Sequence, residues 1–481
     1  MIIILITFFL IFTLICVKNI RYGVYAVIFS MPLYLVRFSI GGIPSTALEM
    51  MIYILFLVWF FGRIRKNNFY PALAGFNRLC KNNFVLSIGI ALLFLGLTIS
   101  TFNSTDLRTS FGIFKGWFID PFLFFLVFVS VIKKEKHIDL VLTSWLFSGI
   151  IVSLISIYYL YIGELTFDGR LHAFYLSPNH LAMYLAPAFL IALFFLNNSL
   201  SFPRRRESTA TINIDFGIIQ NIKRIPNIKY SIFSIVVLII ILIPLYFTYS
   251  YGAFLGIFAG VVYLSAVGNK NLFILRGFSR RLRSFSFTSF QSDWRLKPSR
   301  TQILKFLHDK LLLAILLSFI FTGFIFISSN KFNQIINSNS RSSFHSRLMI
   351  WNVAGEIIKD NFLFGIGPGT FQETYLSYAE KFDEQYLEWA VPQPHNIFLA
   401  FYLQTGLIGF IGFVLILIWF FFRRDAINCV STTVKTIITV LMIYTLIHGL
   451  VDTTYWKNDL ALMFWLIIGL AIVENLALDK N

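Results

Sequence analysis

Residues 396–422 read NIFLAFYLQTGLIGFIGFVLILIWFFF and contain no charged side chain. A helix needs about 20 predominantly apolar residues to cross the hydrocarbon core of a bilayer, so this stretch is long enough to span a membrane. Charged or polar residues flank it, with His395 in front and Arg423 and Arg424 behind. The segment therefore predicts a transmembrane helix.

The rest of the chain repeats this pattern. Hydrophobic residues make up 57% of the 481 positions and charged residues only 13%, whereas a soluble domain has about 45–50% and about 25%. The mean hydropathy of +0.75 excludes a soluble enzyme, a disordered regulator and a fibrous protein. We expect an all-α, polytopic membrane helix bundle of about 12–13 spans. Candidate spans are 1–17, 22–38, 46–62, 84–102, 111–132, 140–162, 180–198, 230–248, 252–268, 311–329, 396–422, 434–451 and 459–476.

Basic residues indicate the topology. Most of the 40 Lys and Arg residues fall in alternate connections between spans. Cytoplasmic loops of membrane proteins are enriched in Lys and Arg, so the net charge of +17 is interpreted as a topology signal and not as a nucleic-acid surface. We therefore expect a cytoplasmic C-terminus and an external 330–395 segment. The basic connections are 18–21, 63–83, 133–139, 199–229, 269–310, 423–435 and the C-terminus.

The external segment is predicted to be partly helical. Ser346–Lys359 has an apolar helical face, Gly365–Gly369 predicts a turn, and Tyr375–Trp389 predicts a second helix. We expect four parts along the chain. These are an N-terminal bundle (1–162), central spans with basic cytoplasmic loops (163–329), a large external loop (330–395) and C-terminal spans (396–481).

Charges are scarce within the predicted spans, where Arg37, Lys115 and Asp120 lie near the ends. Ionisable residues inside a bilayer usually mark a transport pathway. Here the polar residues gather on the external side instead. This distribution favours an enzyme that works at the membrane face over a transporter.

Several motifs resemble the bacterial O-antigen ligase/polymerase family. Arg347 and Trp351 on one predicted helix are followed by FGIGPGTF (364–371) and PHNIFLAFYLQTGLIGFIG (394–412). GRLHAFYLSPNHLAMYL (169–185) and HGLVDTTYW (448–456) are similar to two further segments of that family. The resemblance covers about 165–456. It implies a GT-C-like multi-span glycosyltransferase with one large external loop.

Two positions depart from the family pattern. Relatives typically carry Ser-Arg-Gly-Ala where this chain has Ser250-Tyr251-Gly252-Ala253, so an arginine is missing there. Gln404 stands where relatives often have Glu. Arg170 and Arg341 are the candidates to replace the missing arginine.

The resemblance also implies the chemistry. The donor would be a glycan on polyprenyl pyrophosphate, and the acceptor a sugar hydroxyl of lipid A–core or of another repeat unit. Arginine suits the charge that develops on a pyrophosphate leaving group, and a neutral His can accept the hydroxyl proton. No Asp-x-Asp motif occurs. We expect inverting transfer without metal or other cofactor.

Arg347 and His395 are the predicted catalytic residues, with Arg347 on the phosphate and His395 as the base. Each has an alternative, since Arg347 can pair with acids of the loop and His395 can cap the next span. Arg170 is predicted to bind pyrophosphate or to anchor the interface. The remaining candidates for pyrophosphate or glycan binding are Arg341, Asn179, Asn396, His448 and Asp452.

Structural roles are open for most of these residues. Asn179 and Asn396 fit helix N-caps, and the glycines of 365–369 fit a turn better than a phosphate cradle. His448 and Asp452, one helical turn apart, fit either a side-chain pair or a structural contact at the end of a span.

Ligase activity at the inner membrane, with the active site on the periplasmic face, is the function that these features favour. Membrane lipid is an expected partner and nucleic acid is not. A polymerase of the same family, a protein oligosaccharyltransferase, a lipid-linked glycan flippase and a non-catalytic scaffold are the alternatives.

Overall fold

The computed structural model describes residues 2–65, 83–201, 227–268, 343–379, 391–423 and 433–478. These residues are almost entirely helical, which confirms the predicted all-α class. Within them the one sheet is an antiparallel hairpin of β1 (Arg37–Ile40) and β2 (Ile43–Thr46), with Arg37 opposite Thr46. The predicted span at 311–329 and most of the basic segments 199–229 and 269–310 lie outside the described residues.

Six of the described helices are long and apolar enough to cross a membrane. They agree with the spans predicted at 46–62, 84–102, 111–132, 140–162, 180–198 and 396–422, and the chain is an integral membrane protein. The six are α3 (Ala47–Arg65), α5 (Phe84–Phe102), the continuous run of α6 (Leu107–Ile113), η2 (Phe114–Ile119) and α7 (Asp120–Val131), α8 (Glu135–Tyr161), α9 (Pro178–Ser201) and α18 (Ile397–Phe422).

Further apolar helices occupy most of the other predicted spans. They are α1 (Ile2–Lys18), α2 (Ile20–Phe29), α11 (Asn227–Phe247), α12 (Tyr251–Gly268), α20 (Thr433–Gly449) and α21 (Asn458–Leu478). The second span was predicted as one helix over 22–38, which is wrong. Helix α2 ends at Phe29, and the chain continues as a 3-10 turn, η1 (Met31–Leu35), into the hairpin. Pro32 lies at the start of η1, where its ring cannot continue the preceding helix.

The described chain divides into two compact units. Unit 1 combines residues 1–148 with 327–481, and unit 2 covers 149–326. In unit 2, α9 packs against both α11 and α12. The backbone N–H of Leu171 donates to the carbonyl of Phe247 at 2.8 Å, which fixes the connection before α9 to the end of α11.

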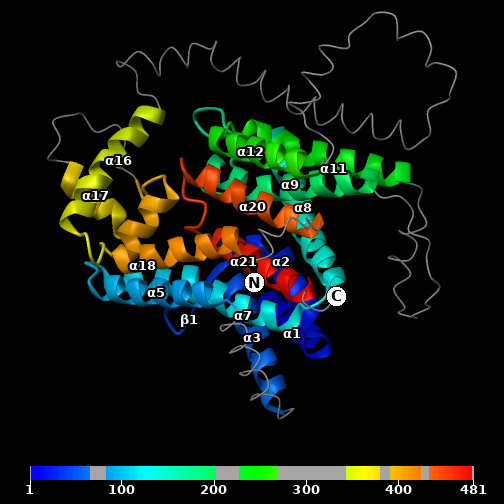
Figure 1. Ribbon diagram of the computed structural model, residues 1–481, viewed down its shortest axis with the longest axis horizontal. Helices are drawn as coiled ribbons and strands as arrows, with labels where there is room; N and C mark the ends of the chain where they lie inside the picture. Colours follow the sequence, from blue (N-terminus) through cyan, green and yellow to red (C-terminus); the bar gives the residue numbers. More distant parts are fainter. Residues whose placement is uncertain are drawn as a thin grey trace, which may run out of the picture. The chain divides into compact units, whose positions relative to one another are not determined.

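In unit 1, α5 and α18 run side by side with their backbones in contact (Figure 1). A Cβ added to Gly96 of α5 would lie 2.5 Å from the Cα of Gly409 of α18. One turn further, a Cβ on Gly412 would lie 2.8 Å from the Cα of Leu93. Small residues allow this approach, which brings dispersion contacts along the whole backbone of both helices.

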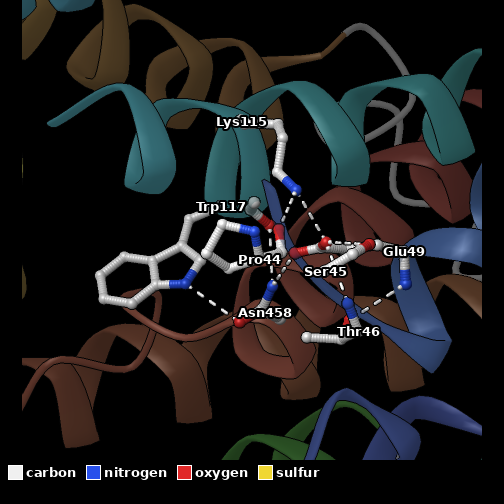
Figure 2. Close-up of polar contacts among 8 residues, drawn as sticks. Pro44, Ser45, Thr46, Glu49, Lys115, Trp117 and Asn458 are labelled. Carbon is white, nitrogen blue, oxygen red and sulfur yellow. Dashed lines mark hydrogen bonds and ion pairs between the residues drawn. The ribbon is translucent and has the colours of Figure 1, made fainter. Parts of the chain in front are cut away.

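A buried polar cluster joins the hairpin, α3, η2 and α21 (Figure 2). Glu49 of α3 is 5% exposed and accepts from Lys115 at 2.9 Å, from Ser45 at 3.0 Å and from Asn458 at 3.2 Å. The indole N–H of Trp117 donates to Asn458 at 3.1 Å. Buried charges are stable only when paired and hydrogen-bonded, and this cluster meets that condition for Glu49. Glu49, which lies in the first turn of α3, is a further charged residue within a predicted span.

The described part of residues 330–395, the segment predicted to be external, forms α16 (Ser343–Asp360) and α17 (Phe371–Ala379). The helix predicted over Ser346–Lys359 is confirmed, and the second predicted helix is described only up to Ala379. Both pack on a shared core that also includes Leu403 of α18. Members of this core are Ile350, Val353, Ala354, Ile357, Ile366, Phe371, Tyr375 and Val391. The segment is therefore anchored to a membrane-spanning helix by apolar contacts.

The close contact of α5 and α18 predicts that one added methyl group lowers the thermal stability of the protein. We expect Gly96→Ala to lower the melting midpoint of the detergent-solubilised protein, because overpacking costs about 1–3 kcal/mol. Gly62→Ala is the matched control, since Gly62 lies in α3 with nothing within 4 Å of an added Cβ. The control should melt at the same or a slightly higher temperature. Equal midpoints for the two variants would contradict the close backbone contact.

Candidate functional site

The start of α18 holds the predicted base in place. The side chain of Asn396 caps this helix by accepting from the backbone N–H groups of Phe398 and Leu399 at 2.9 and 3.1 Å. Its amide also donates to the carbonyl of Leu450 at 3.0 Å. Asn396 is therefore the N-cap of α18, as its position in the sequence predicted. Through Leu450 it also ties the start of α18 to the connection between α20 and α21.

His395, directly before the cap, adopts a left-handed backbone conformation with φ of +47°. Residues with a Cβ adopt such a conformation only where the surroundings impose it, and it is found preferentially at functional sites. Here the neighbours impose it from both sides. The indole N–H of Trp351 donates to the carbonyl of Pro394 at 3.0 Å, and the cap fixes residue 396.

The side chain of His395 pairs with Asp452. Their Nδ1 and Oδ1 atoms lie 3.3 Å apart, and the side chains are 29% and 5% exposed. Burial alone would raise the pKa of Asp452, but the hydrogen bond to His395 and nearby positive charge, including that of Arg347, lower it below its ordinary value. Asp452 therefore remains a carboxylate at neutral pH, and Nδ1 of His395 carries the donated proton.

The side chain of His448 hydrogen-bonds to Tyr444 and not to Asp452, although His448 and Asp452 lie within electrostatic reach of each other. Its Nδ1 atom lies 2.7 Å from the hydroxyl of Tyr444, one turn earlier on α20. The residues at 448 and 452 are linked by the backbone instead, since the N–H of Asp452 donates to the carbonyl of His448 at 3.1 Å. The carboxylate of Asp452 instead contacts His395, which is 57 positions distant.

Arg347 approaches the same carboxylate from α16. It lies one helical turn before Trp351, so the two side chains share a face of the helix. Arg347 is within electrostatic reach of both Asp452 and His448. Its Nε atom is buried and has no hydrogen-bond partner among the described residues. A buried guanidinium donor without a partner is costly, which suggests that an anionic ligand completes this group.

The glycine turn before α17 docks into a break in α18. Gly406 has φ of +68° inside that helix, and the freed backbone groups bond to the turn. The N–H of Ile366 donates to the carbonyl of Leu403 at 2.7 Å, and the N–H of Leu407 donates to the carbonyl of Leu363 at 3.1 Å. A Cβ on Gly365 would lie 2.8 Å from the nitrogen of Gly406, so glycine is required by the contact.

The same turn is not a phosphate cradle, as its sequence context predicted. The N–H of Gly365 donates to the carbonyl of Asn361, that of Gly367 to the hydroxyl of Ser100, and that of Gly369 to the side chain of Gln404. All three N–H groups are thus engaged within the protein. The buried Gln404 also donates to Gln393 at 2.7 Å, which fixes the strand of chain that leads to His395.

Arg170 occupies a second polar cluster, in unit 2. Its Nε donates to the carbonyl of Thr248 at 2.8 Å, and Nη2 donates to Asn179 at 2.6 Å. Tyr251 stands at the position where the family resemblance predicts an arginine. It lies within electrostatic reach of Arg170. The missing and the candidate replacement positions are therefore neighbours within this unit.

Asn179 is not a helix N-cap, which corrects one prediction. Helix α9 begins at Pro178, and the hydroxyl of Ser177 accepts from the backbone N–H of His180 at 3.2 Å. Asn179 lies within the first turn and orients Arg170 instead. Arg341 lies outside the described residues. Among the residues that are described, no three His, Cys, Asp or Glu side chains are close enough to hold a metal ion.

Comparison with known proteins connects this geometry to a family. Residues 235–414 match the sequence model of the family described as O-antigen ligase. Over this range the chain is similar to the O-antigen ligase family. No curated protein matches the chain. The matched range includes Arg347, His395 and the docked glycine turn, and it ends before Asp452. The family indicates a glycosyltransferase-type enzyme that acts on a lipid-linked glycan and a glycan acceptor.

The sequence did not indicate the contacts that three residues of this site make. They are Asp452, Trp351 and Gln404. Helical spacing offered only His448 as a side-chain partner of Asp452 and did not indicate its contact with His395. Trp351 was quoted only as part of a motif, and Gln404 only as a departure from the family pattern. The hydrogen bonds of Trp351 and Gln404 cross between separate segments, and no spacing within one segment indicates them.

The cap of α18 leads to a prediction for the thermal stability of the protein. We expect Asn396→Ala to lower the melting midpoint, because loss of an Asn cap costs about 0.5–2 kcal/mol. Asn396→Asp keeps the acceptor for the helix N–H groups but cannot donate to Leu450. It should therefore recover most of the stability while still loosening the 449–452 connection. A thermal melt of both variants in detergent measures this, and identical losses would contradict the capping role.

Proposed function

We propose that this chain is an O-antigen ligase-type glycosyltransferase of the bacterial inner membrane. It would move a glycan from polyprenyl pyrophosphate to a sugar hydroxyl of lipid A–core, on the periplasmic face. The observation that carries the proposal is the pairing of His395 with the buried carboxylate of Asp452 beside Arg347. This arrangement supplies a base and an anion-binding group within one unit of the structure.

His395 is proposed to act as the general base. Because Asp452 accepts the proton-bearing Nδ1, the lone pair of the neutral imidazole is on Nε2. The side chain is 29% exposed, so an acceptor hydroxyl can reach it. As the hydroxyl oxygen attacks the anomeric carbon, its proton passes to Nε2. Asp452 then stabilises the imidazolium that forms, in the manner of the carboxylate of a catalytic triad.

Arg347 is proposed to bind the leaving group. Attack with inversion breaks the bond between the anomeric carbon and the pyrophosphate oxygen, and negative charge grows on polyprenyl pyrophosphate. The buried Nε of Arg347 lacks a partner among the described residues and is available for a phosphate oxygen. A guanidinium stays protonated and offers several donors in a fixed plane, so it stabilises this charge without a proton transfer. We propose that no metal is needed for this step.

Arg170 is proposed as a second pyrophosphate ligand. Support comes from its cluster with Asn179 and Tyr251, because that cluster brings a cation beside the position where relatives have arginine. Its hydrogen bonds to Thr248 and Asn179 would orient the guanidinium before the donor arrives. Arg341 remains a candidate on the resemblance alone.

The first test is transfer by purified variants in liposomes that contain the lipid-linked donor and the core acceptor. His395→Ala should lower kcat about 10²–10⁴-fold, the usual contribution of a general base. Asp452→Asn should lower kcat with little change in KM, since the neutral amide no longer stabilises an imidazolium and its NH2 group can favour the wrong tautomer of the imidazole. Arg347→Gln should also lose transfer.

Two charge-removing variants serve as controls for that assay. Asp360→Asn removes an acid at the end of α16 that bonds to Tyr378, and Lys359→Gln removes an exposed cation of the same helix. Both should retain transfer. If His395→Ala kept full activity, the assigned base would be wrong even if the chain is a glycosyltransferase.

Gene deletion in the native host distinguishes the acceptors. Loss of a ligase should leave bare lipid A–core, with long glycan chains retained on polyprenol. Loss of a polymerase should leave core that carries a single repeat unit. Gel analysis of surface lipopolysaccharide and of the polyprenyl-linked pool measures both, and the second pattern would replace the ligase proposal by polymerase activity.

A further inference from the structure

A surface groove of about 320 Å³ runs between α2 and α8 in unit 1. Its lining is mainly apolar, and Phe29 and Phe147 are 40% and 47% exposed. Large apolar side chains at the surface of a membrane-spanning bundle face acyl chains and not water. The lining residues are Tyr25, Ala26, Phe29, Leu140, Thr143, Ser144 and Phe147.

The two ends of the groove differ in character. One end is closed by a hydrogen bond between the helices, in which the hydroxyl of Ser148 donates to the carbonyl of Phe29 at 2.5 Å. At the other end are three exposed cations, Arg21, Lys134 and Lys136. All three are within electrostatic reach of His137, so they converge on the beginning of α8.

The cations are placed over the groove by helix periodicity. Arg21, Tyr25 and Phe29 recur every four residues and share one face of α2. His137, Leu140 and Ser144 recur at three and four residues and share one face of α8. A molecule lying along the groove therefore meets apolar side chains first and positive charge at its end.

Two buried polar atoms at this end have no hydrogen-bond partner among the described residues. They are Nδ1 of His137, a side chain that is only 5% exposed, and the hydroxyl of Tyr25, which lines the groove. Tyr25 is within electrostatic reach of Arg21. Buried polar atoms normally find a partner, so these two atoms suggest a ligand with hydrogen-bonding oxygens at the cationic end.

We propose that this groove binds one anionic phospholipid, with its phosphate at Arg21, Lys134 and Lys136 and an acyl chain between α2 and α8. Basic pockets between transmembrane helices recognise anionic headgroups in this way. The cations belong to the connections 18–21 and 133–139, which the distribution of Lys and Arg assigns to the cytoplasmic leaflet. The sequence of both connections carries five cations, Lys18, Arg21, Lys133, Lys134 and Lys136, against Glu135 and Asp139.

Native mass spectrometry of the full chain in detergent tests the proposal. Phosphatidylglycerol and phosphatidylcholine with the same acyl chains are the two probes. We expect one phosphatidylglycerol to be retained preferentially. Arg21→Gln combined with Lys134→Gln should weaken its binding about thirtyfold, since each cation near a lipid surface contributes about 1 kcal/mol. Ala26→Phe should also weaken binding, without any change of charge, because it fills the groove.

Arg63→Gln combined with Arg65→Gln is the matched control. These two residues lie in the last turn of α3, so the variant removes the same charge from another basic end. It should bind phosphatidylglycerol like the original chain. Equal retention of the two lipids would overturn the proposal, as would equal weakening by the two double variants. Unchanged binding in Ala26→Phe would exclude the groove as the acyl-chain site. A thermal melt verifies that each variant is folded.

Discussion

A helix within a membrane must satisfy all its backbone hydrogen-bonding groups inside the protein, and α18 does so despite a break at Gly406. The turn that follows α16 supplies the partners, because Ile366 and Leu363 bond to Leu403 and Leu407 on either side of the break. The docking is possible only with glycine at 365 and 406. Helices α16 and α17 are thus held by the same backbone hydrogen bonds that complete a membrane span.

This constraint also fixes the positions of the candidate site residues. Helix α18 begins directly after His395 and the capping residue Asn396. The middle of this helix is hydrogen-bonded to the turn between α16 and α17. Helix α16 in turn presents Trp351 to the backbone of Pro394 and Arg347 to the carboxylate of Asp452. Three segments distant in the sequence therefore converge because each is attached to α18 or to the connection after α20. The geometry on which the proposed proton transfer and charge stabilisation rest follows from these attachments.

Much of this architecture is predictable from the sequence, and the reasons are physical. The length of the apolar segments indicates α3, α5, α8, α9 and α18, because a run of about 20 apolar residues is typical of a transmembrane helix. Amphipathic spacing indicates α16, and the cap at Asn396 follows from its position before an apolar run. The features that the sequence did not predict depend on contacts between residues far apart in the chain. The 3-10 turn and hairpin after α2 interrupt an apolar run, and Asp452 reaches a histidine that no helical spacing connects to it. The roles of Arg347 and His395 were predicted from motifs, and their proximity to Asp452 adds a geometric argument.

The left-handed backbone of His395 has a consequence for how this protein has been selected. A residue with a Cβ is strained there by roughly 1–2 kcal/mol, and glycine would adopt the same conformation with no such strain. Selection for thermal stability alone would therefore favour another residue at this position. Histidine at 395 therefore lowers the free energy of unfolding relative to glycine and holds its imidazole at the position that we propose for the base. With the proposed role of His395 as the base, stability and activity oppose each other at this position, and a more heat-resistant variant obtained by changing it would be a less active one.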